Sequence, residues 1–336
     1  MCSFVVFSSD NLSLSDLSKA LKKVYHRGPD NNYLAIENGL LWGFNRLSIM
    51  DLSSNGNQPF KYDSCELVCN GEIYNYNSFK KLLSQEYIFH SNSDCEVLIP
   101  LYLKYGIEIM CKMLDAEFAL VLYNSKDNSI MAARDPMGIR PMFYGYTKKD
   151  HKISFASEAK ALIDYCNDIM PFPPGHYYKD GKFTCYNDLS NTKFINNDNL
   201  NTIFTNIRTK LISAVEKRLH ADAPIGYLLS GGLDSSLVCS IAQRMIKDPI
   251  KTFAIGMDTD PIDLKYAKQA ADYLGTDHTE VIINKNDVLK TLDEVIYHLE
   301  TFDITTIRAS IGMYLLCKYI HENTDLKVIL TGEVSN

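Results

Sequence analysis

The spacing of apolar residues changes near residue 190 of this 336-residue sequence, and this change restricts the fold more than any other feature. Before it, short apolar runs separated by turn residues predict many strands and few helices. Those helices are expected at 14–24, 76–84 and 94–105. After it, apolar runs alternate with amphipathic stretches expected as helices at 233–246, 262–274, 286–299 and 308–322. Because this alternation is typical of a parallel sheet covered on both faces, the two halves should fold differently.

A polar segment rich in asparagine, SNTKFINNDNLNT, separates the two patterns and predicts a linker. We therefore expect a first domain at 1–190, a linker at 191–200 and a second domain at 201–336. In the second domain, ligands should bind beyond the carboxyl ends of the parallel strands.

Composition argues against several classes of protein. A net charge of -7 and the lack of a basic run indicate no nucleic-acid partner. No apolar run approaches the ~20 residues that span a bilayer, and the start lacks the basic segment of a signal peptide, so no membrane is expected. The 9 cysteines are scattered without paired metal-ligand spacing, which predicts free, mostly buried thiols in the cytoplasm.

The opening MCSFVVFSS places a cysteine directly after the initiator methionine. Aminopeptidases remove this methionine readily when a small residue follows, which would leave Cys2 with a thiol and a free α-amine. An α-amine with a pKa near 7.7–8.0 can act as a base for the thiol at neutral pH. Cys2 alone would more often be a buried thiol, so the other motifs must decide.

Three short motifs offer what hydrolysis of glutamine would need besides a nucleophile. CNGEIYN supplies Asn70 and Gly71, whose side-chain amide and backbone N–H can donate to an oxyanion. FNRLSIMD supplies Arg46 for an α-carboxylate, and NSDCEV supplies Asp94 for an α-ammonium group. Each motif has a plainer explanation: a hairpin turn, a surface charge and a helix N-cap, respectively.

The segment YLLSGGLDSSLV lies where an expected strand ends and an expected helix begins. Ser230, Gly231 and Gly232 can present backbone N–H groups to a phosphate, and the helix adds its positive end. The lysine of a Walker loop is missing, and Asp234 follows instead, as suits a Mg²⁺ ion that bridges phosphate oxygens. A glycine-rich turn with an N-cap is the plainer alternative.

With YHRGPD and ARDPMGIRPMFYG, the motifs of the first half resemble the glutaminase domain of N-terminal-nucleophile amidotransferases. The resemblance implies a four-layer α/β/β/α sandwich in which Cys2 is the nucleophile and Asn70 and Gly71 form the oxyanion hole. The glutamine-binding residues that it implies are Arg46, Leu47, Ser48, Ile49, Met50, Asn70, Gly71, Glu72 and Asp94.

In the second half, the glycine-rich segment resembles the pyrophosphate loop of ATP pyrophosphatases. KTFAIGM, AADYLGTDHTEV, LETFDITTIRASIGMYLL and VILTGE resemble the asparagine synthetase branch of that group. The resemblance implies an adenine-nucleotide α-hydrolase-like domain, with Glu333 as acid/base for the attack of ammonia and Asp234 as metal ligand. The ATP-binding residues that it implies are Leu228, Ser230, Gly231, Gly232, Asp234, Ser235, Ile255, Thr331 and Gly332.

Both resemblances together imply a ligase, a glutamine-dependent asparagine synthetase. Its small-molecule partners would be glutamine, aspartate and ATP, with Mg²⁺ entering as part of the ATP complex and no permanently bound cofactor. Ammonia released from glutamine would convert β-aspartyl-AMP to asparagine.

The sequence departs from the family pattern in several places. Ser3 and Ala116 each stand where the family has glycine, and Glu117 stands where a residue without charge is usual. At the end, Val334 and Asn336 replace a glycine and a metal-binding aspartate, and the sequence stops short of the family's helical continuation. A truncated relative with glutaminase activity alone, or a non-catalytic binding role, is therefore an alternative. Weak ATP–pyrophosphate exchange and association through the C-terminal region, for instance as a homodimer, are expected from it.

Overall fold

The computed structural model describes residues 1–191, 197–259 and 261–332. The chain divides into two compact units, Met1–Ile195 and Asn196–Asn336. Much of the predicted linker lies outside the described residues, so the boundaries 1–190, 191–200 and 201–336 stay a prediction.

The N-terminal unit contains two six-stranded sheets, with strand orders β10-β8-β9-β1-β3-β2 and β12-β11-β7-β6-β5-β4. Pairing between neighbouring strands is antiparallel in both sheets. The strands are β1 (Ser3–Phe7), β2 (Asn31–Glu37), β3 (Leu40–Arg46), β4 (Phe60–Tyr62), β5 (Cys65–Ile73), β6 (Ala116–Asn124), β7 (Ser129–Arg134), β8 (Phe143–Thr147), β9 (Ile153–Ala156), β10 (Cys166–Pro171), β11 (His176–Lys179) and β12 (Lys182–Cys185).

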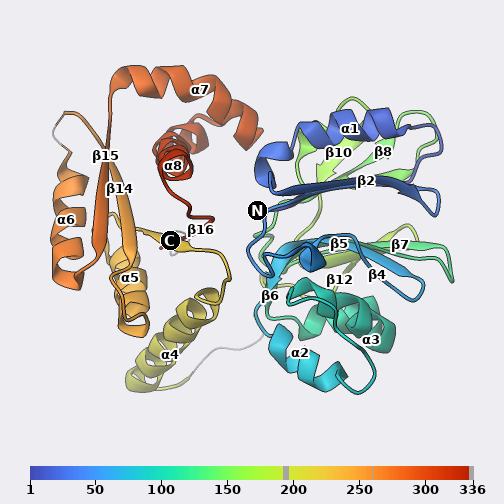
Figure 1. Ribbon diagram of the computed structural model, residues 1–336, viewed down its shortest axis with the longest axis horizontal. Coiled ribbons are helices and arrows are strands. Elements are labelled where there is room, and N and C mark those ends of the chain that lie inside the picture. Colours follow the sequence, from blue (N-terminus) through green and yellow to red (C-terminus); the bar gives the residue numbers. More distant parts are fainter. Residues whose placement is uncertain (192–196, 260, 333–336) are drawn as a thin grey trace. The chain divides into compact units, whose positions relative to one another are not determined.

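Three helices cover the outer faces of these sheets: α1 (Leu14–Lys22), α2 (Tyr76–Leu83) and α3 (Leu98–Met113). Figure 1 shows α1 over the sheet that contains β2, and α2 and α3 on the far side of the sheet that contains β5. The core between the sheets joins side chains of both, among them Phe4, Trp42 and Val121. Further apolar clusters lie under α1 and under α2 and α3. The predicted four-layer α/β/β/α sandwich is confirmed.

The position of β1 follows from its composition. All five residues of β1 are buried, because the strand lies between β9 and β3 and packs apolar side chains on both faces. A continuous apolar run suits such a central strand. The chain enters β1 directly from Cys2, so the second residue is fixed at the edge of the core.

The helix expected at 94–105 forms in two parts. A short 3-10 turn, η3 (Cys95–Val97), precedes α3, and α3 is interrupted at Gly106, which has a φ of 77°. Glycine tolerates this positive φ where other residues are strained. The helical segment then continues to Met113, further than the amphipathic pattern predicted.

The C-terminal unit has a four-stranded parallel sheet of order β15-β14-β13-β16. Its strands are β13 (Ile225–Leu228), β14 (Lys251–Met257), β15 (Asp277–Ile283) and β16 (Val328–Leu330). Its helices are α4 (Leu200–Arg218), α5 (Leu233–Met245), α6 (Ile262–Leu274), α7 (Lys285–Leu299) and α8 (Ile304–Asn323).

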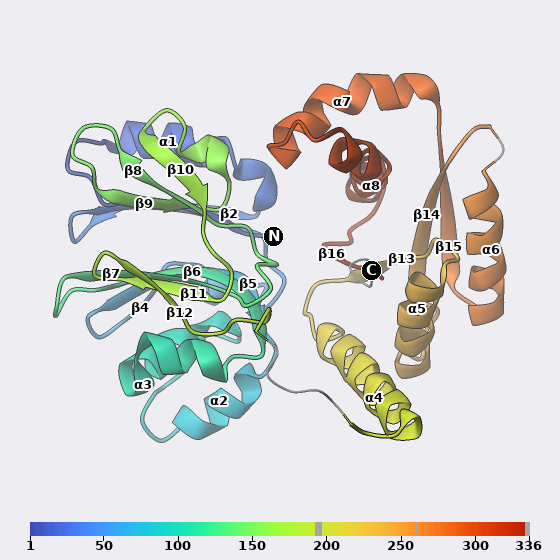
Figure 2. The same ribbon diagram turned by 180° about the vertical axis from the view of Figure 1, so that it is seen from behind.

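Helices lie on both faces of this sheet, as predicted. Side chains of α4, α5 and α6 share apolar clusters with one face, whereas side chains of α8 pack on the other face. Figure 2 shows α5 and α8 on opposite sides of the sheet, with α7 beside α8. Helix α4 was not predicted separately. It begins where the asparagine-rich segment ends, and the Asn199 side chain caps it by accepting from Thr202 N.

Candidate functional site

Cys2 lies at the entrance to β1 and is partly buried. Its thiol exchanges two contacts with the backbone of Leu47, which follows β3: Leu47 N donates to Cys2 Sγ at 3.4 Å, and Cys2 Sγ donates to Leu47 O at 3.6 Å. Burial raises the pKa of the Cys2 thiol. A thiol in this position therefore needs a base or a nearby cation to become a nucleophile.

The α-amine beside the thiol belongs to Met1, because Met1 precedes Cys2 in the chain. Burial lowers the pKa of this amine to about 5, and the charges of Arg27 and Arg140 lower it as well. The amine is thus uncharged near neutral pH, which is the form that can accept a proton from a thiol.

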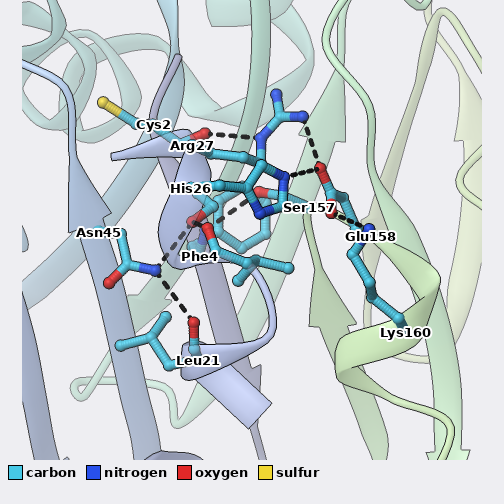
Figure 3. Close-up of polar contacts among 11 residues, drawn as sticks. Cys2, Phe4, Leu21, His26, Arg27, Asn45, Ser157, Glu158 and Lys160 are labelled. Atoms are coloured by element: carbon cyan, nitrogen blue, oxygen red, sulfur yellow. Dashed lines mark hydrogen bonds and ion pairs between the residues drawn. The ribbon is translucent and has the colours of Figure 1, made fainter. Parts of the chain in front are cut away.

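A polar network fixes the backbone of Cys2 from one side (Figure 3). Arg27, in the 3-10 turn η1 (Tyr25–Arg27), donates from Nε to Cys2 O at 3.2 Å and from Nη1 to Glu158 Oε1 at 2.8 Å. Lys160 and His26 also contact the Glu158 carboxylate, at 2.8 Å and 3.3 Å. Glu158 follows Ser157, whose hydroxyl accepts from Phe4 N at 3.0 Å, so the network is fixed to β1.

The serine that departs from the family pattern is accommodated within this network. Ser3 is fully buried, and its hydroxyl donates to Val24 O at 3.0 Å and accepts from Asn45 Nδ2 at 3.1 Å. The added side chain therefore has its hydrogen bonds satisfied and binds β1 to β3, beside the cysteine rather than on it.

The predicted oxyanion donors lie on β5. Asn70 is buried, and its Nδ2 has no hydrogen-bond partner among the residues that the structure describes. A buried amide without a partner costs free energy unless a ligand or water binds it, so such a group marks a site of function. At Gly71, a Cβ atom would lie 2.7 Å from Glu117 O and 2.8 Å from Phe118 Cβ, so that only glycine fits.

Arg46 lies at the end of β3, but its guanidinium is already engaged. Nη1 donates to Ser53 O and Asn57 Oδ1, each at 2.7 Å, and Nη2 donates to the carbonyl groups of Met50 and Asp51. Arg46 therefore holds the loop after β3 in shape. Its prediction as the carboxylate clamp stays a prediction, and any such contact must be made in addition to these.

The rest of the predicted glutamine-binding segment forms this turn. Leu47 contacts the thiol, Ser48 N donates to Asp30 Oδ2 at 2.8 Å, and Met50 supplies a carbonyl to Arg46. Ile49 lies between them in the chain and is partly buried. The turn is thus fixed by its backbone, which suits a recess lined by main-chain atoms.

Asp94, the predicted ammonium ligand, is buried, and Glu72, a predicted glutamine-binding residue, is partly buried and near it. Asp94 Oδ2 accepts from Ile73 N at 2.6 Å, which ties the segment before η3 to the end of β5. Burial raises the pKa of both Asp94 and Glu72, and for Glu72 the charge of Asp94 adds to the increase. A cationic group bound between them would offset this cost. The Asp94 side chain makes no capping hydrogen bond to η3, so the alternative that Asp94 is present only as a helix N-cap is not supported.

Three charged residues beside Cys2 were not assigned a role from the sequence: Arg27, Glu158 and Arg140. Two of them lie inside motifs that supported the resemblance, YHRGPD and ARDPMGIRPMFYG. The positive charge of these two residues, in motifs that otherwise look like turns, was a signal that could have indicated a role near Cys2. Glu158 offered no such signal, because two of its partners, His26 and Arg27, are far away in the sequence.

In the C-terminal unit, the glycine-rich loop closes around one hydroxyl group. Ser235 Oγ accepts from Ser230 N at 3.2 Å, lies 2.9 Å from Ser230 Oγ and donates to Gly232 O at 3.3 Å. Gly231 has a φ of 79°, and a Cβ there would lie 2.4 Å from the backbone of Tyr266. Gly232 caps α5 without a side-chain hydrogen bond, so the helix presents its first N–H groups uncapped by a side chain.

The other predicted nucleotide ligands gather at the same edge of the sheet. Leu228 ends β13, Ile255 lies in β14, and Thr331 and Gly332 follow β16, which pairs with β13 in parallel. A Cβ at Gly332 would lie 2.6 Å from Ser235 N, so this glycine lies directly on the first turn of α5. The loop and the strand ends thus lie at the carboxyl edge of the parallel sheet, where ligands bind in folds of this kind, and their role in binding a nucleotide stays a prediction.

Asp234 lies in the first turn of α5 and is partly exposed. A single carboxylate beside a phosphate loop fits Mg²⁺, which commonly takes one or two carboxylates together with substrate phosphates. No cluster of three or more metal-ligating side chains occurs within the described residues. Glu333, Val334 and Asn336 lie outside the described residues, so their predicted roles are not tested.

Two family models match the chain. A glutamine amidotransferase domain model matches residues 1–180, and an asparagine synthase model matches residues 206–336. The glutamine-hydrolysing asparagine synthetase of Cricetulus griseus is 40% identical over 375 residues, which cover 100% of this chain and 66% of that protein. The corresponding human protein is 39% identical over 375 residues, with the same coverage of 100% and 66%.

A probable asparagine synthetase of Acanthamoeba polyphaga mimivirus is 38% identical over 362 residues, which cover 99% of this chain and 65% of that protein. The chain belongs to the glutamine-dependent asparagine synthetase family. It spans about two thirds of the length of these relatives. Membership in the family explains why an amidotransferase sandwich and a phosphate-loop unit occur in one chain.

Among the described residues, no helix has the length and apolar character needed to cross a membrane. The cysteines, all of which lie in the described part of the chain, form no disulfide. Six are buried and Cys2 is partly buried, whereas Cys185 and Cys317 are exposed, so the prediction of buried thiols does not hold for these two.

Proposed function

We propose that this chain catalyses the ATP-dependent amidation of aspartate to asparagine with ammonia taken from glutamine, and is therefore a ligase. One observation carries the proposal: a glutamine amidotransferase domain and an asparagine synthase domain follow one another in a chain 38% to 40% identical to glutamine-hydrolysing asparagine synthetases. The geometry of both sites supports it.

In the N-terminal unit, removal of Met1 would give Cys2 the free α-amine. This amine takes the thiol proton, and Sγ bonds to the amide carbon of glutamine. Asn70 Nδ2 and Gly71 N donate to the resulting oxyanion, and the buried, unpartnered state of Nδ2 supports this role. The C–N bond then breaks, the leaving nitrogen takes the proton and departs as ammonia, and water hydrolyses the thioester to glutamate.

Recognition of glutamine rests on the surrounding charges. Asp94 and Glu72 would bind the α-ammonium group, which restores the charged state that burial disfavours in both. Arg46 would bind the α-carboxylate while it holds the loop that includes Leu47 and Ser48.

In the C-terminal unit, the loop Ser230–Gly232 and the first turn of α5 would hold the phosphates of ATP, with Mg²⁺ bound by Asp234 and those phosphates. Leu228, Ile255, Thr331 and Gly332 would enclose the nucleoside. An oxygen of the aspartate side chain attacks the α-phosphorus, so that β-aspartyl-AMP forms and pyrophosphate leaves. Ammonia then attacks the activated carbonyl, with Glu333 as acid/base, and AMP leaves.

The unbridged cysteines support a reducing compartment, and we place the protein in the cytoplasm. Association of copies into a homodimer is a further part of the proposal, which light scattering would measure. No comparison favours the alternative of a glutaminase without synthetase activity.

An isotope experiment tests the proposal. The purified protein is incubated with aspartate, Mg-ATP and glutamine labelled with ¹⁵N in its amide, and asparagine is analysed by mass spectrometry. We expect asparagine that carries the label, with AMP and glutamate formed in equal amounts. Labelled ammonia and glutamate without asparagine would instead support the glutaminase alternative.

A further inference from the structure

Glu117 is a charged residue that the glutaminase step proposed above does not use, and the structure places it in the N-terminal unit near Glu72. It lies in β6 directly opposite Glu72 of β5. Because side chains alternate along a strand, Glu117 shares its face with Ala119, and Glu72 shares its face with Asn70. Ala119 belongs to the core between the sheets, against which Cys2 packs. Glu117 therefore lies on the face of the sheet that carries the predicted oxyanion donor.

The partners of Glu117 are Arg140 and Tyr74. Arg140 Nη2 lies 3.6 Å from Glu117 Oε2, and both side chains are nearly buried, with 9% and 13% exposed. The Tyr74 hydroxyl donates to Glu117 Oε1. A buried carboxylate held from two sides in this way has a fixed position and fixes that of its cationic partner.

Arg140 reaches the start of the chain. In the chain that retains Met1, its Nη1 contacts Met1 Sδ. Against the effect of burial, its positive charge also lowers the pKa of the Cys2 thiol, which stays in the chain after Met1 is removed. Its Nε is buried without a partner among the described residues. A guanidinium that leaves a buried donor unused is not placed for stability alone, because such a donor costs free energy.

We propose that Glu117 and Arg140 form a positioning pair that sets the charge around Cys2 Sγ, with Glu117 offsetting the cation that Arg140 brings to the nucleophile. This inference rests on the proposed function, since it assigns the pair to the glutaminase step. The loss of either charge should change the reactivity of the thiol, and in opposite directions.

The other titratable and charged groups near the thiol are not substituted in the test. They are the α-amine, Arg27 at the Cys2 carbonyl, Arg46 next to Leu47, and Glu72 on β5 with its neighbour Asp94. The pair differs from them because the positive and negative members can be removed separately or together, with no net change of charge in the last case.

The test measures the alkylation of Cys2 by iodoacetamide between pH 5 and 10, resolved by peptide mass spectrometry. Glu117→Gln should move the midpoint of the profile down by roughly half a pH unit or more, and Arg140→Met should move it up by a similar amount. The double variant and Glu117→Asp should both stay near wild type. The exposed Cys185 in the same unit serves as an internal control whose profile should not move.

Unchanged profiles in both single variants, or shifts of equal sign, would overturn the proposal. A variant that does not fold is replaced by Glu117→Asp together with Arg140→Lys, which keep the charges and should restore the wild-type profile. Because alkylation needs no glutamine, the test distinguishes a failure of this proposal from a failure of the proposed function. Shifted profiles without glutamine hydrolysis contradict the proposed function alone, whereas hydrolysis with unchanged profiles contradicts the pair alone.

Discussion

Two asparagine side chains of the N-terminal unit show how identical residues take different roles. Asn45 Nδ2 donates to Ser3 Oγ and to Leu21 O, so both partners are protein groups. Asn70 Nδ2 is equally buried and has no partner among the described residues. The first amide contributes to stability, and the second is available to a ligand.

This contrast gives a matched prediction. Asn70→Ala should lower kcat for glutamine hydrolysis by about 10²–10³-fold, the usual effect of losing one oxyanion donor, with little loss of stability. Asn45→Ala should instead lower the free energy of unfolding by ~1–3 kcal/mol, because Ser3 Oγ and Leu21 O both lose the donor that Asn45 Nδ2 supplies. Steady-state kinetics and urea unfolding on both variants provide the check. Equal effects of the two changes on stability and on kcat would contradict the assignment.

Arg46 allows a second prediction at the level of the residue. Its guanidinium makes contacts with four oxygen atoms of the following loop, which a lysine ammonium could not reproduce in the same plane. Arg46→Lys should therefore raise KM for glutamine by at least tenfold, about 1.4 kcal/mol, and also lower Tm. A raised KM with an unchanged Tm would show that the loop does not depend on these contacts.

The sequence predicted this site in part. Four candidate residues could be predicted because each lies in a short motif whose residue types indicate a chemical role: Cys2, Asn70, Gly71 and Asp94. The contact of Arg27 with Glu158 and that of Arg140 with Met1 could not be derived, since these pairs are 131 and 139 residues apart in the chain. Contacts of that kind depend on the packing of the two sheets.

At the scale of structural elements, Glu158 ties η1 to the segment after β9. Burial alone would raise the pKa of Glu158, but His26, Arg27 and Lys160 outweigh it and lower the pKa to about 2. Because this lies below the ordinary value of 4.5, the carboxylate stabilises the fold above pH 4.5, and this contribution is lost as the pH falls toward 2.

Between pH 5 and pH 2, we expect the free energy of unfolding of the wild-type protein to fall by at most about 3 kcal/mol more than that of Glu158→Gln. The exposed Glu86, paired with Lys104 on the surface, supplies the control variant Glu86→Gln, which should follow wild type. Urea unfolding at several pH values measures the difference. Parallel curves for wild type and Glu158→Gln would show that the network does not stabilise the unit.

The glycine-rich loop that contains Gly231 gives a further prediction, and Gly275, which has a similar backbone conformation, provides the control. Gly231 and Gly275 have φ values of 79° and 70°, but a Cβ at Gly231 would meet the backbone of Tyr266, whereas nothing lies within 4 Å at Gly275. Both alanine variants should lose about 1 kcal/mol of stability from the left-handed conformation, and Gly231→Ala should lose more because its Cβ meets the Tyr266 backbone. Only Gly231→Ala should also weaken ATP binding, by tenfold or more in calorimetry. Equal affinities would contradict the phosphate site.

Regular alternation allowed α5, α6 and α7 to be predicted to within a residue or so at each end. Short strands such as β4, with three residues, and the edge strand β2, with exposed side chains, gave weaker patterns and were not predicted individually. Helix α4 was hidden because its start overlaps the asparagine-rich segment, where the cap Asn199 looks like a further linker residue. A polar capping residue at the start of a helix and exposed side chains on an edge strand both make the pattern of apolar residues harder to recognise.

At the scale of the whole molecule, two units with separate chemistry lie in one chain. The N-terminal unit offers a thiol, an unpartnered amide and buried carboxylates, and the C-terminal unit offers a phosphate loop at the carboxyl edge of a parallel sheet. Under the proposed function, ammonia made by the first unit is used by the second. Glutamine and free ammonia should therefore be interchangeable nitrogen sources only when the thiol is intact.

The most direct test of this account is asparagine formation by Cys2→Ala, measured in parallel with glutamine and with ammonium chloride. We predict that the variant loses synthesis from glutamine, by at least ~10³-fold, because no other group can form the thioester. It should keep the wild-type rate with ammonia, since the second site is unchanged, and Cys185→Ala should behave as wild type with both. Synthesis from glutamine that survives the loss of Cys2 would contradict the central claim.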